Sequence, residues 1–159
     1  MICIFGIMSL PNIYKQETVN QLIERIHKIK PDTHPQWGKM NAGQMLAHCN
    51  VTYEMAIDGK HAKAKGVKRW LLTKFVKPVV VSEKPYKKNG STAPEFKVSP
   101  KQEFEKEKER MINYLQKSCE LGEAHFEGKE SNSFGKLNKT EWNNMFYKHL
   151  DHHLVQFGV

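Results

Sequence analysis

The chain has 159 residues, which suits one domain of ordinary size and is too short for two. Hydrophobic residues make up 39% of the chain, enough for a real core, so disorder over the whole length is excluded. The formal net charge of +8 excludes an acidic protein and favours an anionic partner, although a solvated basic surface explains it equally well.

Residues 1–8 are almost all apolar, but the run is far shorter than the roughly 20 residues of a membrane span. It also lacks the basic region and cleavage site of a secretory signal. Met8 is an alternative start, so residues 1–7 are either native or an extension of the gene prediction. We expect an N-terminal tail over residues 1–14, one domain over 15–159 and no membrane partner.

The three cysteines, Cys3, Cys49 and Cys119, are odd in number and have no Cys-x-x-Cys spacing. This pattern argues against a disulfide framework and against a thiolate zinc site. Free thiols indicate a reducing compartment, so we expect a cytoplasmic location.

Two amphipathic helices are predicted in the first third of the chain. Apolar residues recur at helical spacing from Val19 to Ile26 and predict a helix over 16–29, which Pro31 ends. Asn41 is a suitable N-cap for a second helix over 42–57, which Gly59 ends. Its apolar stripe is Met45, Cys49, Tyr53 and Ala56, and His48 lies on the same side.

The segment 60–97 is the least regular part of the chain, and we expect an insertion packed against the helices. A short amphipathic helix is predicted over 67–76, and Pro78 and the later prolines are expected to break the remainder into loop. The basic segment 60–88 lies here, and its basic residues are Lys60, Lys63, Lys65, Lys68, Arg69, Lys74, Lys77, Lys84, Lys87 and Lys88.

Two more helices are predicted in the second half of the chain. Ser99, Pro100 and Gln102 have the pattern of a helix start, and Gly122 is expected to end this third helix. Asn138 and Glu141 repeat the capping pattern for a fourth helix that runs to about Phe157. Its inward stripe reads Trp142, Met145, Phe146, His149, His153, Gln156 and Phe157. Four amphipathic segments with almost no alternating pattern predict an all-α four-helix bundle.

A candidate metal site comes from three histidines. His149 and His153 are four residues apart, so on a helix both can reach one ion, and His48 lies on the inward face of another helix. Three neutral imidazoles leave a coordination position open, as in catalytic sites. The alternative of core histidines bonded to backbone carbonyls is equally compatible with the pattern.

His152 also has ligand spacing to His149, but it lies nearer the edge of the stripe than His153 does. We therefore expect His153 to be the ligand. His152 and Gln156 are then the candidate catalytic helpers, because no other general base is evident among these residues.

Two sequence blocks resemble an uncharacterised branch of the DinB/YfiT-like superfamily. They are Trp37-Gly38-Lys39-Met40 with Gln44 to Cys49, and Phe134-Gly135-Lys136-Leu137 with Lys148 to Gly158. The resemblance implies a four-helix bundle, often dimeric, with a metal on His48, His149 and His153. One departure is visible, because relatives of this branch often carry His-Pro where this chain has Asn132-Ser133.

Relatives in this superfamily include transferases and isomerases that depend on mycothiol or bacillithiol, and a metal-dependent hydrolase. The resemblance therefore implies a divalent metal and a thiol transferase reaction on a small-molecule substrate. We expect the metal to be zinc or nickel, because imidazole ligands suit both. Two alternatives remain open: a metal-dependent hydrolase, and a protein without enzymatic activity that binds nucleic acid through its basic segment.

Overall fold

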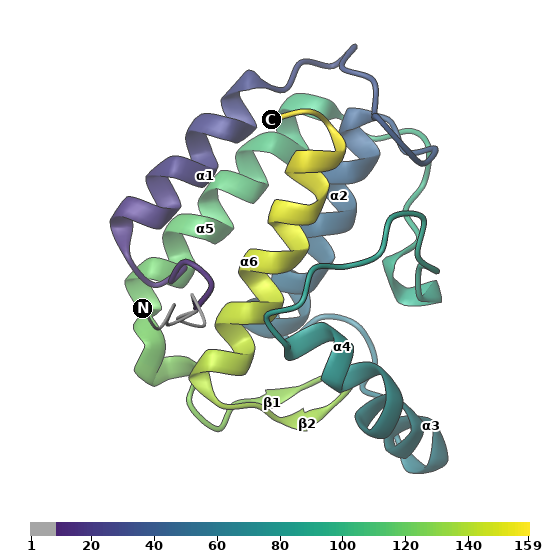
Figure 1. Ribbon diagram of the computed structural model, residues 1–159, viewed down its shortest axis with the longest axis vertical. Helices are drawn as coiled ribbons and strands as arrows, with labels where there is room; N and C mark the ends of the chain where they lie inside the picture. The colour runs from purple at the N-terminus through teal and green to yellow at the C-terminus, as the bar shows by residue number, and fades with distance from the viewer. Residues whose placement is uncertain (1–8) are drawn as a thin grey trace, which may run out of the picture.

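The structure, a computed structural model, describes residues 9–159 and is mainly helical (Figure 1). Its four longest helices lie side by side: α1 (Gln16–Lys28), α2 (Ala42–Tyr53), α5 (Phe104–Phe126) and α6 (Lys139–Gln156). At one end of these helices lie α3 (Gly66–Leu71) and α4 (Lys77–Val81). Two short antiparallel strands, β1 (Glu130–Ser131) and β2 (Gly135–Lys136), lie near them. The prediction of a mainly α fold is confirmed.

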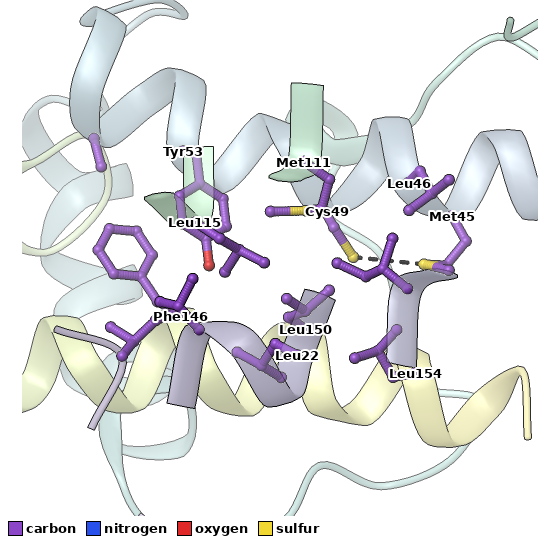
Figure 2. Close-up of a cluster of buried hydrophobic side chains, with 14 of the residues drawn as sticks. Leu22, Met45, Leu46, Cys49, Tyr53, Met111, Leu115, Phe146, Leu150 and Leu154 are labelled. Atoms are coloured by element: carbon purple, nitrogen blue, oxygen red, sulfur yellow. Dashed lines mark hydrogen bonds between the residues drawn. The ribbon is translucent and has the colours of Figure 1, made fainter. Parts of the chain in front are cut away.

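The core lies between the four long helices, and all four contribute to it (Figure 2). Figure 2 labels Leu22 of α1; Met45, Leu46, Cys49 and Tyr53 of α2; Met111 and Leu115 of α5; and Phe146, Leu150 and Leu154 of α6. All ten are at most 1% exposed. Each fully buried side chain of this kind contributes about 1.5–3 kcal/mol, so these contacts fix how α2 and α6 lie relative to each other.

Helices α2 and α6 are buried on a second side as well. Every residue of α2 except Gln44 is buried. On α6, Leu150 and Leu154 face the core, while Met145 and His149 line a cavity on the other side. The inward stripe predicted for this helix therefore merged two different faces. The second face is covered by the segment between α2 and α5, because α4 contacts α6 and a short 3-10 helix, η3 (Pro94–Phe96), contacts α2.

Both helices that carry the candidate histidines begin with the predicted cap. The Asn41 side chain accepts a hydrogen bond from the backbone N–H of Gln44 at 2.8 Å, and the Gln44 side chain accepts one from Asn41 in return. Asn138 and Glu141 make the same reciprocal pair at the start of α6. Helix α2 continues into a π-helical turn, η1 (Glu54–Asp58), and Gly59 ends it at φ 67°.

The segment after Gly59 is more helical than predicted. Helix α3, the π-helical turn η2 (Leu72–Val76) and α4 succeed one another without a break from Gly66 to Val81, and we call them together the α3–α4 rod. The expectation that Pro78 would end the helix is wrong. Pro78 lies in the first turn of α4, where its missing N–H and fixed φ are tolerated.

Two boundaries of the third predicted helix are also corrected. Helix α5 begins at Phe104 rather than at Pro100, because residues 99–102 instead pack against the start of α2. A Cβ on Gly43 would lie 3.2 Å from the Gln102 carbonyl oxygen, and the Asn41 side chain donates to the Pro100 carbonyl. Gly122 does break the helical backbone at φ 70°, but helical structure resumes and reaches Phe126.

Residues 11–14, part of the predicted N-terminal tail, pack against α6. The Ile13 side chain is fully buried, and its backbone N–H donates to the Asn143 side chain at 2.7 Å. The Asn143 side chain in turn donates to the Pro11 carbonyl. Residues 1–7 and Cys3 lie outside the described residues, and the division into a tail and one domain stays a prediction.

The other two cysteines, Cys49 and Cys119, are free thiols. Among the described residues, no helix combines the length and the apolar composition that a membrane span requires.

The cap of α6 gives a prediction about stability. Replacing Asn138 by Ala removes the oxygen that satisfies the Glu141 N–H, and should lower the free energy of unfolding by about 1 kcal/mol. Asn138→Asp keeps an acceptor at this position and should keep most of the stability. Urea unfolding followed by circular dichroism measures both, and equal losses in the two variants would contradict this role.

Candidate metal centre

The structure brings the three predicted histidines together. One ring nitrogen from each of His48, His149 and His153 lies within 4.8 Å of the others. His48 comes from α2, and the other two come from successive turns of α6. The 2.9 Å contact between the Nε2 atoms of His48 and His149 crosses from one helix to the other. The helical spacing in the sequence therefore identifies the three histidines that meet in the structure. The packing of α2 against α6 in the core brings His48 into contact with the pair on α6.

Each imidazole is held from its other nitrogen by an oxygen atom. The Nδ1 of His48 lies 2.9 Å from the Phe96 carbonyl, and the Nδ1 of His149 lies 3.0 Å from the Thr52 hydroxyl. The Nδ1 of His153 lies 2.7 Å from Oε1 of Gln156. Such partners orient metal-binding histidines and select the tautomer that leaves Nε2 free.

Two of these tautomers are determined by the partner groups. The Phe96 carbonyl can only accept, so His48 carries its proton on Nδ1. The Gln156 side chain uses its NH₂ group to donate to the Trp37 carbonyl at 2.6 Å, so its oxygen accepts from Nδ1 of His153. His48 and His153 therefore present unprotonated Nε2 atoms to each other and to His149. Only the Thr52 hydroxyl can either donate or accept, so only His149 can use either tautomer.

Converging lone pairs fit a cation. With two Nε2 atoms fixed as acceptors, the cluster needs either a proton on Nε2 of His149 or a metal ion among the three rings. Two nitrogens bound to one tetrahedral zinc ion lie about 3.3 Å apart, given Zn–N distances of about 2.0–2.1 Å. The 2.9 Å separation of His48 and His149 needs only a small opening to match this value. The residues therefore fit a divalent ion.

Burial keeps these rings neutral. It lowers the pKa of all three histidines, and for His153 the pKa falls to about 3, with nearby His48 as the second cause. For His149, His48 and His153 add to the lowering in the same direction. Neutral imidazole is the form that binds a metal, so no ligand has to lose a proton near pH 7.

The Trp37-Gly38 motif has a structural role at this site. The Trp37 carbonyl holds the Gln156 amide, which in turn holds His153. Gly38 has φ 83°, and a Cβ there would lie 2.6 Å from the Gln156 amide nitrogen. Glycine therefore allows the loop to reach the amide closely enough for this bond. Both atoms of the Gln156 amide group are used in orienting His153, and the role of Gln156 as a catalytic helper stays a prediction.

A cavity of about 950 Å³ lies against the three histidines. One wall is formed by α2, η1 and α6, with Thr52, Met55 and Met145 beside the imidazoles. The opposite wall comes from the 60–97 segment and is mostly apolar, with Leu72, Val76, Val79, Tyr86 and Phe96. The predicted insertion thus forms half of the pocket.

His152 also lies at the cavity but not in the metal cluster. Its ring is 5.7 Å from the Tyr86 ring and 5.2 Å from the His153 ring, measured between centroids. Its pKa is lowered, mainly by burial, while Asp151 opposes the shift. Asn132 and Ser133, at the departure from the DinB pattern, both line the cavity, and the Asn132 amide donates to the Lys60 and His61 carbonyls.

Two features of the site were missed at the level of sequence. Thr52 is one helical turn after His48 on the same face, a spacing that could have revealed it. The Phe96 carbonyl had no sequence signal, because a backbone oxygen in an irregular segment is independent of side-chain pattern. Cys49, noted beside His48, faces the core, where its thiol contacts the Met45 sulfur at 3.8 Å.

The two neighbouring histidines of α6 should differ in their effect on bound metal. His153→Ala removes a converging Nε2 atom and should abolish stoichiometric binding of zinc or nickel, while His152→Ala should retain it. Elemental analysis of the purified proteins measures the metal content, with His149→Ala as a second variant that should lose it. If His152→Ala lost the metal and His153→Ala kept it, His152 and not His153 would be the ligand.

The Thr52 hydroxyl gives a matched test of ligand orientation. Thr52→Val keeps the shape but removes the partner of His149 Nδ1, and should weaken metal binding by roughly 10–100-fold. Thr52→Ser keeps a hydroxyl and should bind nearly as well as wild type. Competition with a chromophoric chelator gives the dissociation constants, and equal affinities in the two variants would mean that this hydrogen bond does not orient the ligand.

Comparison with protein families gives a match over nearly the whole chain. The family model described as a protein of unknown function, DUF1569, matches residues 12–158. No curated protein and no solved structure matches the chain. None of these findings supports the DinB/YfiT-like placement. Since the family model covers nearly the whole chain, the protein belongs to the DUF1569 family.

Proposed function

We propose that this protein is a metal-dependent enzyme that binds one divalent ion, zinc or nickel, on Nε2 of His48, His149 and His153. The observation that carries the proposal is the convergence of these three nitrogens at the wall of a large cavity. A purely structural histidine cluster would not need two unprotonated Nε2 atoms that face each other and a third imidazole. It would also not need to border a cavity of ligand size.

The arrangement of the helices supports a distant relation to the DinB/YfiT-like superfamily. One histidine lies on the second long helix and a pair lies on the last one, which is the pattern that the superfamily uses for its metal. We propose the four-helix bundle topology of that superfamily, and also its frequent homodimer. The free thiols favour the cytoplasm.

A divalent ion held on neutral ligands lowers the pKa of a thiol or a water molecule in its open coordination position. The chain's own residues would orient the ligands, limit water and accept a proton. Thr52, the Phe96 carbonyl and Gln156 hold the three rings in place, so binding requires little rearrangement. The apolar wall formed by the 60–97 segment limits water around the reacting groups. His152, at the cavity beside the cluster, is positioned to accept the proton of the nucleophile.

We favour a thiol as the nucleophile, and therefore a bacillithiol-type S-transferase. Lys84 and Lys87 of the basic segment line the cavity, where they can attract the carboxylates of such a thiol, while Lys68 there is paired with Glu95. The second substrate would be an apolar electrophile that suits the opposite wall. A metal-dependent hydrolase is the enzymatic alternative, because the same site could activate water.

An assay with thiol and electrophile tests the reaction. The metal-loaded protein should join a low-molecular-weight thiol, bacillithiol among those tried, to an electrophile such as a chloro-aromatic compound or an epoxide. His48→Ala, which removes one ligand, should lose at least about 100-fold in rate, because the thiol is no longer deprotonated near neutral pH. Chromatography detects the conjugate.

Two results would count against a transferase. A rate that is unchanged in His48→Ala would show that the reaction does not use this site. Hydrolysis of an ester or amide panel by the wild type but not by His48→Ala, with no conjugate formed, would favour the hydrolase.

A further inference from the structure

The α3–α4 rod carries an unusual combination of residues. From Lys60 to Ser82 the chain contains no aspartate or glutamate, while lysines recur along it. In Figure 1, α3 extends away from the four long helices at the lower right of the molecule. Glu95, Glu130 and Glu141 of other segments pair with Lys68, Arg69 and Lys77. Among the described residues, Lys65 and Lys74 have no such acidic partner, so they carry the uncompensated positive charge of this projecting segment.

The same rod exposes a stripe of large apolar side chains, which we call the outer face. Its members share helical spacing, and they are Val67, Trp70, Leu71 and Phe75. Val67 is 74% exposed, Phe75 60% and Trp70 56%. Contiguous exposed apolar surface is uncommon on isolated proteins and marks a site of interaction.

This exposure does not come from a loosely attached helix. Leu72, Val80 and Val81, on the inner side of the rod, pack against the core cluster. The Lys148 ammonium of α6 donates to the Val79 and Ser82 carbonyls, and Arg69 pairs with Glu130 of β1 at 2.9 Å. The protein thus fixes the rod with its outer face directed outward.

The charges select the kind of partner. The Lys74 ammonium lies 5.0 Å from the centre of the Trp70 ring and 5.6 Å from that of Phe75, so a cation lies within the apolar stripe itself. Two copies of this chain meeting through the outer face would bring these lysines together, and the repulsion opposes such a dimer. The partner must therefore offer negative charge and an apolar phase together.

An anionic lipid bilayer offers both. Trp and Phe side chains enter the boundary between headgroups and acyl chains, while flanking lysines contact the headgroups. We propose that the outer face docks this protein on anionic membrane surfaces. The expectation of no membrane partner rested on the lack of a spanning segment, which has no bearing on docking of this peripheral kind.

The test uses the full-length protein and vesicles of phosphatidylcholine with about one third phosphatidylglycerol. Wild type should co-sediment with these vesicles at low salt, and much less with pure phosphatidylcholine or at high salt. Trp70→Ser/Phe75→Ser should weaken binding at least ~10-fold, because it removes the inserted side chains. Both residues are exposed, so the thermal unfolding temperature should stay close to that of wild type.

Two matched controls locate the contact. Lys65→Gln/Lys74→Gln should weaken binding to anionic vesicles, while Lys106→Gln/Lys117→Gln, which removes the same charge from exposed positions of α5, should not. Vesicles should shift tryptophan emission to shorter wavelength in wild type but not in Trp70→Phe, in which Trp37 and Trp142 remain. That variant keeps an apolar ring and should still bind.

Three outcomes would overturn the proposal. One is absence of binding to anionic vesicles at low salt, and another is binding that is equal in wild type and in Trp70→Ser/Phe75→Ser. The third is a different occupant of the outer face: duplex DNA that binds in place of vesicles, or a dimer that Trp70→Ser/Phe75→Ser dissociates. The metal content of these variants should match wild type, so this test is independent of the proposed enzymatic activity.

Discussion

A buried imidazole needs a partner for each of its two nitrogens. This requirement links the three histidines of the candidate site to several segments of the chain. The Nδ1 atoms of His48, His149 and His153 are satisfied by oxygens from three different segments. Each bond turns a ring so that its Nε2 faces the other two. An unsatisfied nitrogen in this position would cost about 1–3 kcal/mol, so the cluster is stable only if something bridges the converging atoms.

Two segments outside the long helices help to hold this arrangement. The loop around Trp37 reaches Gln156 because Gly38 leaves room for the amide, and η3 brings the Phe96 carbonyl to His48. The side of the 60–97 segment that faces the histidines forms one wall of the cavity. The side that faces away from the protein carries the exposed apolar residues of the outer face. One segment therefore shapes the cavity and, in our proposal, meets the membrane.

Much of this could be predicted from periodicity, and the errors have physical causes. The histidine trio and the caps at Asn41 and Asn138 are local patterns, so the sequence indicates them directly. The predicted inward stripe of α6 combines two faces because the helix is buried on two sides, and one periodic signal cannot separate Phe146, in the core, from His149, at the cavity. The start of α5 and the continuation through Pro78 depend on tertiary contacts and on a π-helical turn, which override local preference.

In our proposal, three imidazole Nε2 atoms bind one metal ion. X-ray absorption spectroscopy on the zinc-loaded protein tests it most directly, because it reports the number and type of ligands. Three imidazole nitrogens are expected at about 2.0–2.1 Å, with one further light atom in the open position. A sulfur scatterer at about 2.3 Å in the absence of added thiol, or fewer than three imidazoles, would contradict it.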